Sequence, residues 1–282
     1  MNALTVKNLT KFYPLFTLDN VGFSIEQGHI AGLIGRNGAG KSTTLKGIMK
    51  LISTSGEVRF FDKDMATDER EIKELIGYVG GGFRYYPNKT LATVGKVVSS
   101  FYSDWDNEKY KRYLAEFRLD VSKKVQELSE GMKVKFSLAL AMSHNAKVLI
   151  MDEPTSGLDP LSREEFCDIV LSLVRNEGVT VLFSTHITSD LMRIADDIIY
   201  ISDGKVLLSE PLEKITSKYS LAHFSESEQA EKAQAIGVKQ VKDGYEGLIL
   251  KESDPCGATV TEATLDHIMI HLENAKKKGE SV

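Results

Sequence analysis

The chain has 282 residues, of which 42% are hydrophobic and 27% are charged, so it is long enough for one large core or one core and an annex. The formal net charge of −5 argues against a general binder of phosphate backbones, and no nucleic-acid partner is expected. The longest apolar runs are far shorter than the roughly 20 residues that cross a bilayer, so we expect no membrane span.

The N-terminal segment MNALTVKNLTKFY alternates between apolar and polar residues, as a strand does, and it lacks an apolar core of signal-peptide length. Several short strands up to residue 34 predict a β region here. The two cysteines, Cys167 and Cys256, have no CxxC partner and are typical of reduced, structural residues. We therefore expect a cytosolic protein.

A glycine-rich loop, GRNGAGKST, directly follows the expected strand HIAGLIG. The spacing of Gly35, Gly40, Lys41 and Ser42 lets successive backbone N–H groups surround phosphate oxygens. Lys41 would bind the β and γ phosphates, Ser42 would bind Mg²⁺, and the following helix adds the positive end of its dipole. A plain glycine-rich turn is the alternative. The candidate nucleotide-binding residues are Gly35, Asn37, Gly38, Ala39, Gly40, Lys41, Ser42 and Thr43.

Residues of about 85–145 are richer in helical patterns, with an apolar stripe at Val134, Leu138 and Ala141. The stretch LSEGM stands at the start of the helix that carries this stripe. Ser129 and Gly131 at a helix N-terminus could bind an anion, or Ser129 could simply cap the helix by accepting backbone N–H groups. The local pattern leaves both interpretations open.

Between residues 147 and 208, apolar strands alternate with helical patterns, which predicts an α/β fold with a largely parallel sheet. The strand KVLIMDE ends in two acids at the carboxyl edge of this sheet, where open α/β sheets bind ligands. Asp152 would bind Mg²⁺, directly or through water. Glu153 would polarise an attacking water.

The last part of the chain has shorter and more polar elements. We expect a small α+β domain over residues 210–282, after a main domain over residues 1–209. The final helix of this small domain has one apolar face, formed by Leu265, Ile268, Met269 and Leu272. That face fits packing against strands of the same domain, such as EGLILK, with a docking surface as the alternative.

The motifs GRNGAGKST, LSEGM, VLIMDEPTSGLDP and LFSTH stand in the order and spacing of the ATP-binding cassette (ABC) family, which residues of about 3–208 resemble. The resemblance implies a P-loop NTPase core of the α/β class, with an N-terminal antiparallel β region and an inserted helical subdomain. It also implies ATP and Mg²⁺ as cofactors, and ATPase activity. LSEGM matches the family signature, usually LSGGQ, so Ser129, Glu130 and Gly131 would bind the ATP held by another subunit.

Three further residues match positions with a role in this family. Tyr13 matches the aromatic residue that stacks on adenine, with packing in the core as the alternative. His186 matches the switch histidine, which would contact the γ-phosphate and the attacking water and link them to Glu153. Asp159 matches the loop through which two subunits touch, and it could also cap the helix that follows. The candidate catalytic residues are Glu153, His186 and Lys41.

The sequence departs from the family at a glutamine that contacts Mg²⁺ and the attacking water. Gly81 stands at that place, and no glutamine occurs between Gln27 and Gln126. Three consecutive glycines, residues 80–82, predict a loose segment with weaker coupling or slower hydrolysis, unless a neighbouring group compensates. Arg36, where the family commonly has proline, is a lesser departure.

The resemblance implies two protein partners. A second ABC ATPase subunit would complete the sites, and the presence of every chemical motif except the glutamine favours a homodimer over a heterodimer. An integral membrane permease would bind the region around Phe83 to Phe101. This binding would hold the chain peripherally on the inner face of the cell membrane, as part of an exporter. The alternative is a soluble regulatory or assembly ATPase that acts on protein or nucleic acid.

Overall fold

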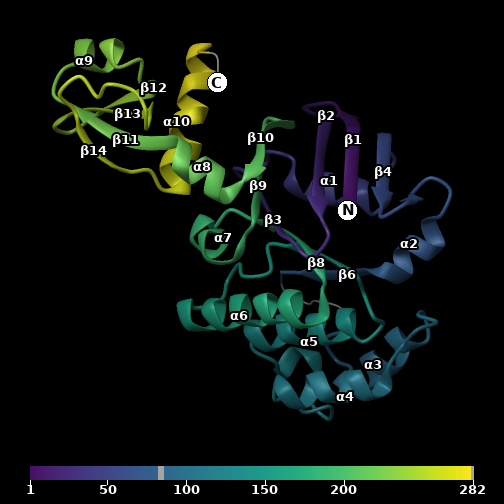
Figure 1. Ribbon diagram of the computed structural model, residues 1–282. Coiled ribbons are helices and arrows are strands. Elements are labelled where there is room, and N and C mark those ends of the chain that lie inside the picture. The colour runs from purple at the N-terminus through teal and green to yellow at the C-terminus, as the bar shows by residue number, and fades with distance from the viewer. Residues whose placement is uncertain (82–85, 281–282) are drawn as a thin grey trace. The chain divides into compact units, whose positions relative to one another are not determined.

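The computed structural model describes residues 1–81 and 86–280 of the chain. The chain forms two compact units, Met1–Ser209 and Glu210–Val282, whose elements are labelled in Figure 1. Gly82 and Phe83, which belong to the glycine run and to the expected permease-binding region, lie outside the described residues. Within the described ranges, none of the helices combines the length and the hydropathy of a membrane-spanning segment.

An antiparallel sheet begins the first unit. Its four strands are β1 (Asn2–Tyr13), β2 (Phe16–Glu26), β4 (Ser55–Phe60) and β5 (Lys63–Asp64). They follow the order β2-β1-β4-β5, and each neighbouring pair is antiparallel. Along β1, Leu4 and Val6 are buried while Lys7 is exposed, as expected of a strand with one face on the core. The predicted antiparallel β region is confirmed.

A second sheet of six strands forms the centre of the first unit. Its strands are β3 (Ile30–Ile34), β6 (Ile76–Gly80), β7 (Val148–Asp152), β8 (Thr180–Thr185), β9 (Asp197–Ser202) and β10 (Lys205–Pro211). The order is β10-β9-β3-β8-β7-β6, and β3 pairs in parallel with β8 and β9, as β7 does with β6 and β8. Every side chain of β3 and β8 is buried, because both faces of a parallel sheet are covered. The carboxyl ends of β3, β7 and β8 therefore meet at one edge.

The helices of the first unit lie against this sheet or, in the case of Leu91–Ser99 and Asn107–Glu116, farther from it (Figure 1). They are α1 (Lys41–Ile48), α2 (Glu69–Leu75), α3 (Leu91–Ser99), α4 (Asn107–Glu116), α5 (Glu130–Met142), α6 (Pro160–Glu177) and α7 (Thr188–Ile194), with a 3₁₀ turn at Val125–Glu127. Figure 1 shows α3, α4 and α5 at the same end of the unit, and α4 and α6 both pack against α5. The predicted stripe of Val134, Leu138 and Ala141 is buried in α5.

The second unit is a four-stranded sheet with three helices. Its elements are α8 (Leu212–Lys218), β11 (Tyr219–Phe224), α9 (Ser227–Lys232), β12 (Ile236–Val241), β13 (Gly244–Leu250), β14 (Thr259–Glu262) and α10 (Leu265–Lys278). The strands follow the order β12-β13-β11-β14. The apolar face of α10 packs against β12 and β13, with Leu265, Ile268 and Leu272 buried. This face is thus covered by strands of its own unit.

Candidate nucleotide-binding site

The glycine loop connects the buried strand β3 to the first turn of α1. Gly38 and Gly40 have φ angles of 82° and 115°, a region that favours glycine. A Cβ atom on Gly35 would lie 2.3 Å from the carbonyl oxygen of Ile201, so only glycine fits there. No side chain caps the N-terminus of α1, and its first turn holds no acidic residue. The loop and the helix start thus present backbone N–H groups to an anion.

Lys41 is held beneath this loop by groups from two elements. Its Nζ atom donates to the carbonyl oxygen of Gly35 over 2.8 Å and lies 3.3 Å from Oε1 of Glu153. The side chain is only 7% exposed, so its charge is little screened by water. The ammonium group is therefore positioned between the loop and the acidic end of β7.

Ser42 and Asp152 supply oxygen atoms on the same side of the site. The Ser42 hydroxyl donates to Oδ1 of Asp152 over 3.2 Å. Hydroxyl and carboxylate oxygens suit Mg²⁺, which usually takes its remaining ligands from water and phosphate. Among residues 1–81 and 86–280, no group of three or more His, Cys, Asp or Glu side chains could hold a metal ion. The pair thus fits a metal that is bound largely by a nucleotide and water.

Glu153 and His186 form the second polar pair of the site. Nδ1 of His186 lies 2.8 Å from Oε2 of Glu153, while the other carboxylate oxygen faces Lys41. The two residues follow β7 and β8, which are neighbours in the sheet, so the parallel pairing brings them together. Glu153 is 24% exposed and His186 is 47% exposed, so water can reach both side chains. An acid, an imidazole and an ammonium group thus meet at one point.

These groups line a cavity of about 390 Å³. Its wall consists of Phe16, Arg36, Asn37, Gly38, Gly40, Lys41, Ser42, Thr43, Glu153, Ser156 and His186. Most predicted loop residues therefore face one space, together with Glu153 and His186. Gly35 and Ala39 are buried parts of the loop backbone, and Asp152 reaches the site through Ser42.

Three residues of this wall were not predicted as site residues. Phe16 pairs with Tyr13 across the turn between β1 and β2, and the two ring centroids are 6.3 Å apart. Tyr13 itself is 40% exposed and lies under the ammonium group of Lys11, at 5.6 Å from the ring centroid. Ser156 could have been found from its place in DEPTSGLDP, and Arg36 from its place in the loop.

The signature residues lie elsewhere on the first unit. Ser129 is the N-cap of α5, where its hydroxyl accepts a hydrogen bond from the Met132 N–H over 3.2 Å. Ser129 and Glu130 are exposed, and Glu130 pairs with Lys133 at 2.7 Å. Among the described residues, the wall of the nucleotide cavity includes none of 129–131. The structure therefore shows the capping role and leaves this helix start open to solvent.

Asp159 is also a helix cap. Its carboxylate accepts hydrogen bonds from the N–H of Ser162 over 3.0 Å and from the Ser162 hydroxyl over 2.6 Å. The bonds from Ser162 lower the pKa of Asp159 below its ordinary value. Pro160 follows at the first position of α6, where its fixed φ suits a helix start. Contact with a partner subunit stays a prediction.

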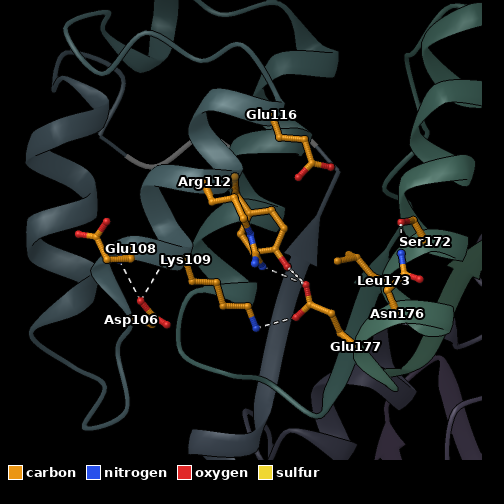
Figure 2. A pocket seen from close by; sticks show the side chains of 10 residues that line it. Asp106, Glu108, Lys109, Arg112, Glu116, Ser172, Leu173, Asn176 and Glu177 are labelled. Carbon is orange, nitrogen blue, oxygen red and sulfur yellow. Dashed lines mark hydrogen bonds and ion pairs between the residues drawn. The ribbon is translucent and has the colours of Figure 1, made fainter.

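A larger cavity of about 750 Å³ lies between α4 and α6 and shares no wall residue with the nucleotide cavity. Figure 2 shows its side chains, with Lys109 and Arg112 pointing toward Glu177. Lys109 Nζ lies 2.6 Å from Glu177, and the Tyr113 hydroxyl also donates to that carboxylate. Both cations of the described cavity wall, Lys109 and Arg112, thus lie beside Glu177, and the glycine loop that accompanies Lys41 is not part of this wall.

Sequence comparisons agree with the motifs. A family profile described as ABC transporter matches residues 18–156. The bacitracin transport ATP-binding protein BcrA of Bacillus licheniformis is 32% identical over 232 residues, which cover 79% of this chain and 75% of that protein. The lantibiotic transport ATP-binding protein SrtF of Streptococcus pyogenes is 34% identical over 210 residues, which cover 73% of this chain and 90% of that protein.

Solved structures give the same result. An ATP-binding subunit of an ABC transporter aligns with a TM-score of 0.68 and 29% identity, covering 76% of this chain and 91% of that chain. A dimeric ATP-binding cassette in a post-hydrolysis state, bound to ADP and Pi, aligns with a TM-score of 0.66 and 27% identity, covering 74% of this chain and 98% of that chain. The predicted resemblance is confirmed: the chain belongs to the ABC transporter family and is one of its ATP-binding cassettes, an ATPase.

Proposed function

We propose that two copies of this chain close around two ATP molecules and thereby drive a separate membrane permease that exports its cargo. One observation carries this proposal. The nucleotide cavity is lined by the loop, Glu153 and His186 of one chain, while the signature residues Ser129 to Gly131, of which the first two are exposed, lie outside it. A second copy can supply the missing side of the site.

The loop with the start of α1, Lys41, Ser42 and Asp152 are proposed to bind the phosphates and the metal ion. The loop N–H groups and the start of α1 bind the phosphates, and Lys41 stabilises the charge that develops during phosphoryl transfer. Ser42 and Asp152 would hold Mg²⁺, which supplies positive charge to the phosphate oxygens when bound. The proposed place of adenine is beside the ring of Phe16, which lines the cavity, and the ring of Tyr13, whose centroid lies 6.3 Å from that of Phe16.

Glu153 and His186 are the residues proposed to act on the attacking water. Glu153 accepts the proton of the attacking water, and a positioned base of this kind contributes roughly 10²- to 10⁴-fold to the rate. His186 orients the carboxylate through the 2.8 Å contact and is exposed enough to face the γ-phosphate as well. Lys41 holds the other carboxylate oxygen until the nucleotide phosphates provide a new partner for its charge.

The signature would complete the site from the second chain. Ser129 and the N–H groups at the start of α5 would form the anion receptor for the ATP of the other chain. Glu130, where the usual signature has glycine, pairs with Lys133, which reduces the repulsion between its charge and a phosphate. Asp159 caps α6 near this surface and is proposed to contact the partner subunit.

The proposed permease site is a third cavity of the first unit, of about 560 Å³, beside the end of α3. Its wall consists of Glu69, Arg70, Lys73, Glu74, Phe101 and Tyr102. Phe101 is 75% exposed, and an aromatic anchor surrounded by charges of both signs fits a peptide segment of a protein partner. The names of BcrA and SrtF, which concern bacitracin and lantibiotic transport, support a peptide-like cargo. Such a partner would place the chain on the cytosolic face of the membrane.

Co-purification from detergent-solubilised membranes tests this function. We expect a polytopic membrane protein to be recovered with the tagged chain. Truncation of an aromatic anchor that becomes buried in an interface costs about 2 kcal/mol or more of binding free energy. Phe101→Ala should therefore strongly reduce the amount of membrane protein that is recovered. Leu250→Ala, which truncates an exposed apolar residue of the other unit, serves as the control. Exclusive recovery of ribosomes or DNA would contradict the transporter and favour a regulatory ATPase.

A further inference from the structure

The end of β6 lies against the backbone of Glu153 without any side chain in between. Gly80 is the register partner of Asp152, and the N–H of Gly81 donates to the carbonyl oxygen of Asp152 over 2.8 Å. A Cβ atom on Gly81 would lie 2.4 Å from the carbonyl oxygen of Glu153 and 3.2 Å from its carbonyl carbon. The first distance is 0.6 Å inside the 3.0 Å that real Cβ atoms keep, so any side chain at Gly81 would displace the Glu153 backbone.

That backbone has little freedom to move. Glu153 has a φ of 51°, a left-handed conformation that is unfavourable for a residue with a side chain. It is fixed by two hydrogen bonds: its N–H donates to Ser184 over 2.9 Å, and its carbonyl oxygen accepts from the Ser156 N–H over 3.1 Å. A shift of the carbonyl oxygen away from Gly81 would disturb the bond to Ser156 and rotate the peptide that sets the direction of the side chain.

The direction of the Glu153 side chain matters because its carboxylate makes two close contacts. One oxygen lies 2.8 Å from His186 and the other lies 3.3 Å from Lys41. Displacement of a reacting group by about 1 Å can cost roughly 100-fold in rate. The 0.6 Å by which a Cβ atom on Gly81 would be too close to the Glu153 carbonyl oxygen is therefore of the same order as a displacement that slows catalysis.

We propose that Gly81 is a positioning residue for Glu153. Because Gly81 has no side chain, the end of β6 can lie directly against the Glu153 carbonyl group, and this contact sets the direction in which the carboxylate points. This inference rests on the proposed role of Glu153 as the base. It also changes the expected effect of a glutamine here. Gly80 and Gly81 are held in strand and hydrogen-bond contacts rather than loose, so Gly81→Gln should slow hydrolysis instead of restoring coupling.

The test compares Gly81→Ala with Gly80→Ala, an equal change one residue earlier. The three atoms nearest to a Cβ atom on Gly80 would all belong to the Tyr78 side chain, at 3.2 to 3.4 Å, and this side chain is 43% exposed, whereas the Cβ atom on Gly81 would meet backbone. For Gly81→Ala we expect kcat to fall by about 100-fold, with ATP affinity changed by less than about twofold, because only the transition state needs the base. Gly80→Ala should keep both values within about twofold of the original chain.

Two comparisons separate this inference from the proposed function. Glu153→Gln that still hydrolyses ATP normally would overturn the role of Glu153 itself. Glu153→Gln without activity, beside Gly81→Ala at normal kcat, would overturn the positioning role alone. In the Glu153→Gln background, adding Gly81→Ala should leave the residual rate unchanged, since both changes remove the same contribution. A second drop of similar size would show that Gly81 acts on something other than Glu153.

A measurement on the unchanged chain covers the case in which Gly81→Ala does not fold. With selective ¹⁵N-glycine labelling, the Gly81 amide should exchange with solvent as slowly as the amides of the neighbouring strand, because it donates to Asp152. Exchange at the rate of an unstructured amide would show that β6 does not close on Glu153, and it would overturn the inference.

Discussion

His271, on α10 of the second unit, is a buried ionisable residue with one unused nitrogen. Its Nδ1 lies 2.9 Å from the carbonyl oxygen of Gly237, so this nitrogen carries the proton, while Nε2 has no hydrogen-bond partner among the described residues. Burial lowers the pKa of His271, and the nearby charged or titratable groups, Lys239, Glu246 and His267, oppose one another. Protonation would bury an N–H without an acceptor.

The consequence is a stability that depends on pH. The unfolded chain binds this proton near pH 6.5 and the folded chain only at lower pH, so the free energy of unfolding of the second unit should fall as the pH drops below about 6.5, by at most about 1.4 kcal/mol per pH unit. Urea unfolding between pH 8 and pH 5 measures this slope. His271→Gln should reduce the slope, and His223→Gln should leave it; equal slopes for all three proteins would contradict the argument.

Single residues of the site could be predicted where they belong to a motif in one continuous stretch of sequence. The glycine loop, Asp152 and Glu153 lie in continuous stretches of sequence, and the structure places these residues at one sheet edge. The role of Phe16 was not predictable, because Tyr13 and Phe16 face each other across a tight turn and the sequence does not show which ring meets the cavity. The effect of Gly81 depends on a distance to a carbonyl 72 residues later in the chain, which no local pattern contains.

Among the helices, α4 and α6 are joined through one carboxylate. Glu177, at the end of α6, accepts from Lys109 over 2.6 Å, lies 3.4 Å from Arg112 and also accepts from the Tyr113 hydroxyl (Figure 2). Burial opposes the charge of Glu177, but the hydrogen bonds from Lys109 and Tyr113 outweigh it and lower the pKa of Glu177 below its ordinary 4.5. The group therefore stabilises the folded chain above that pH and loses this effect on acidification.

We expect Glu177→Ala to lower the free energy of unfolding of the first unit by about 1 to 3 kcal/mol, because it leaves two cations and a hydroxyl without their acceptor. Glu116→Ala removes an acid from the wall of the same cavity that no ion pair holds in the described structure, and it should change stability by less than about 0.5 kcal/mol. Denaturant unfolding at pH 7 measures both. Equal effects of the two changes would show that the ion pairs do not join the helices.

Elements with strong local signals were predicted more fully than their arrangement. The buried strand β7 and the start of α1 follow directly from KVLIMDE and GRNGAGKST. The strand order β10-β9-β3-β8-β7-β6 depends on pairing between segments as far apart as Ala31 and Asp197, so it required the family resemblance or the structure. The face of α10 posed a choice between packing and docking, and its contacts with β12 and β13 resolve it as packing.

For the whole molecule, the glycine loop and the signature lie at separate places on the first unit. The glycine loop lines the nucleotide cavity, whereas Ser129 and Gly131 stand at the exposed start of α5, outside that cavity. Within the proposed function, this separation is the reason that one chain supplies only half of each site. One solved relative is a dimer bound to ADP and Pi. The account therefore depends on ATP being held by two chains at once.

The most direct test is the rate of ATP hydrolysis per chain, measured at saturating ATP and Mg²⁺ while the protein is diluted in the presence of an inert carrier protein. The account predicts that this rate falls in proportion to chain concentration once the dimer dissociates, because a lone chain lacks the second half of the site. A rate per chain that stays constant down to the lowest concentration would contradict it.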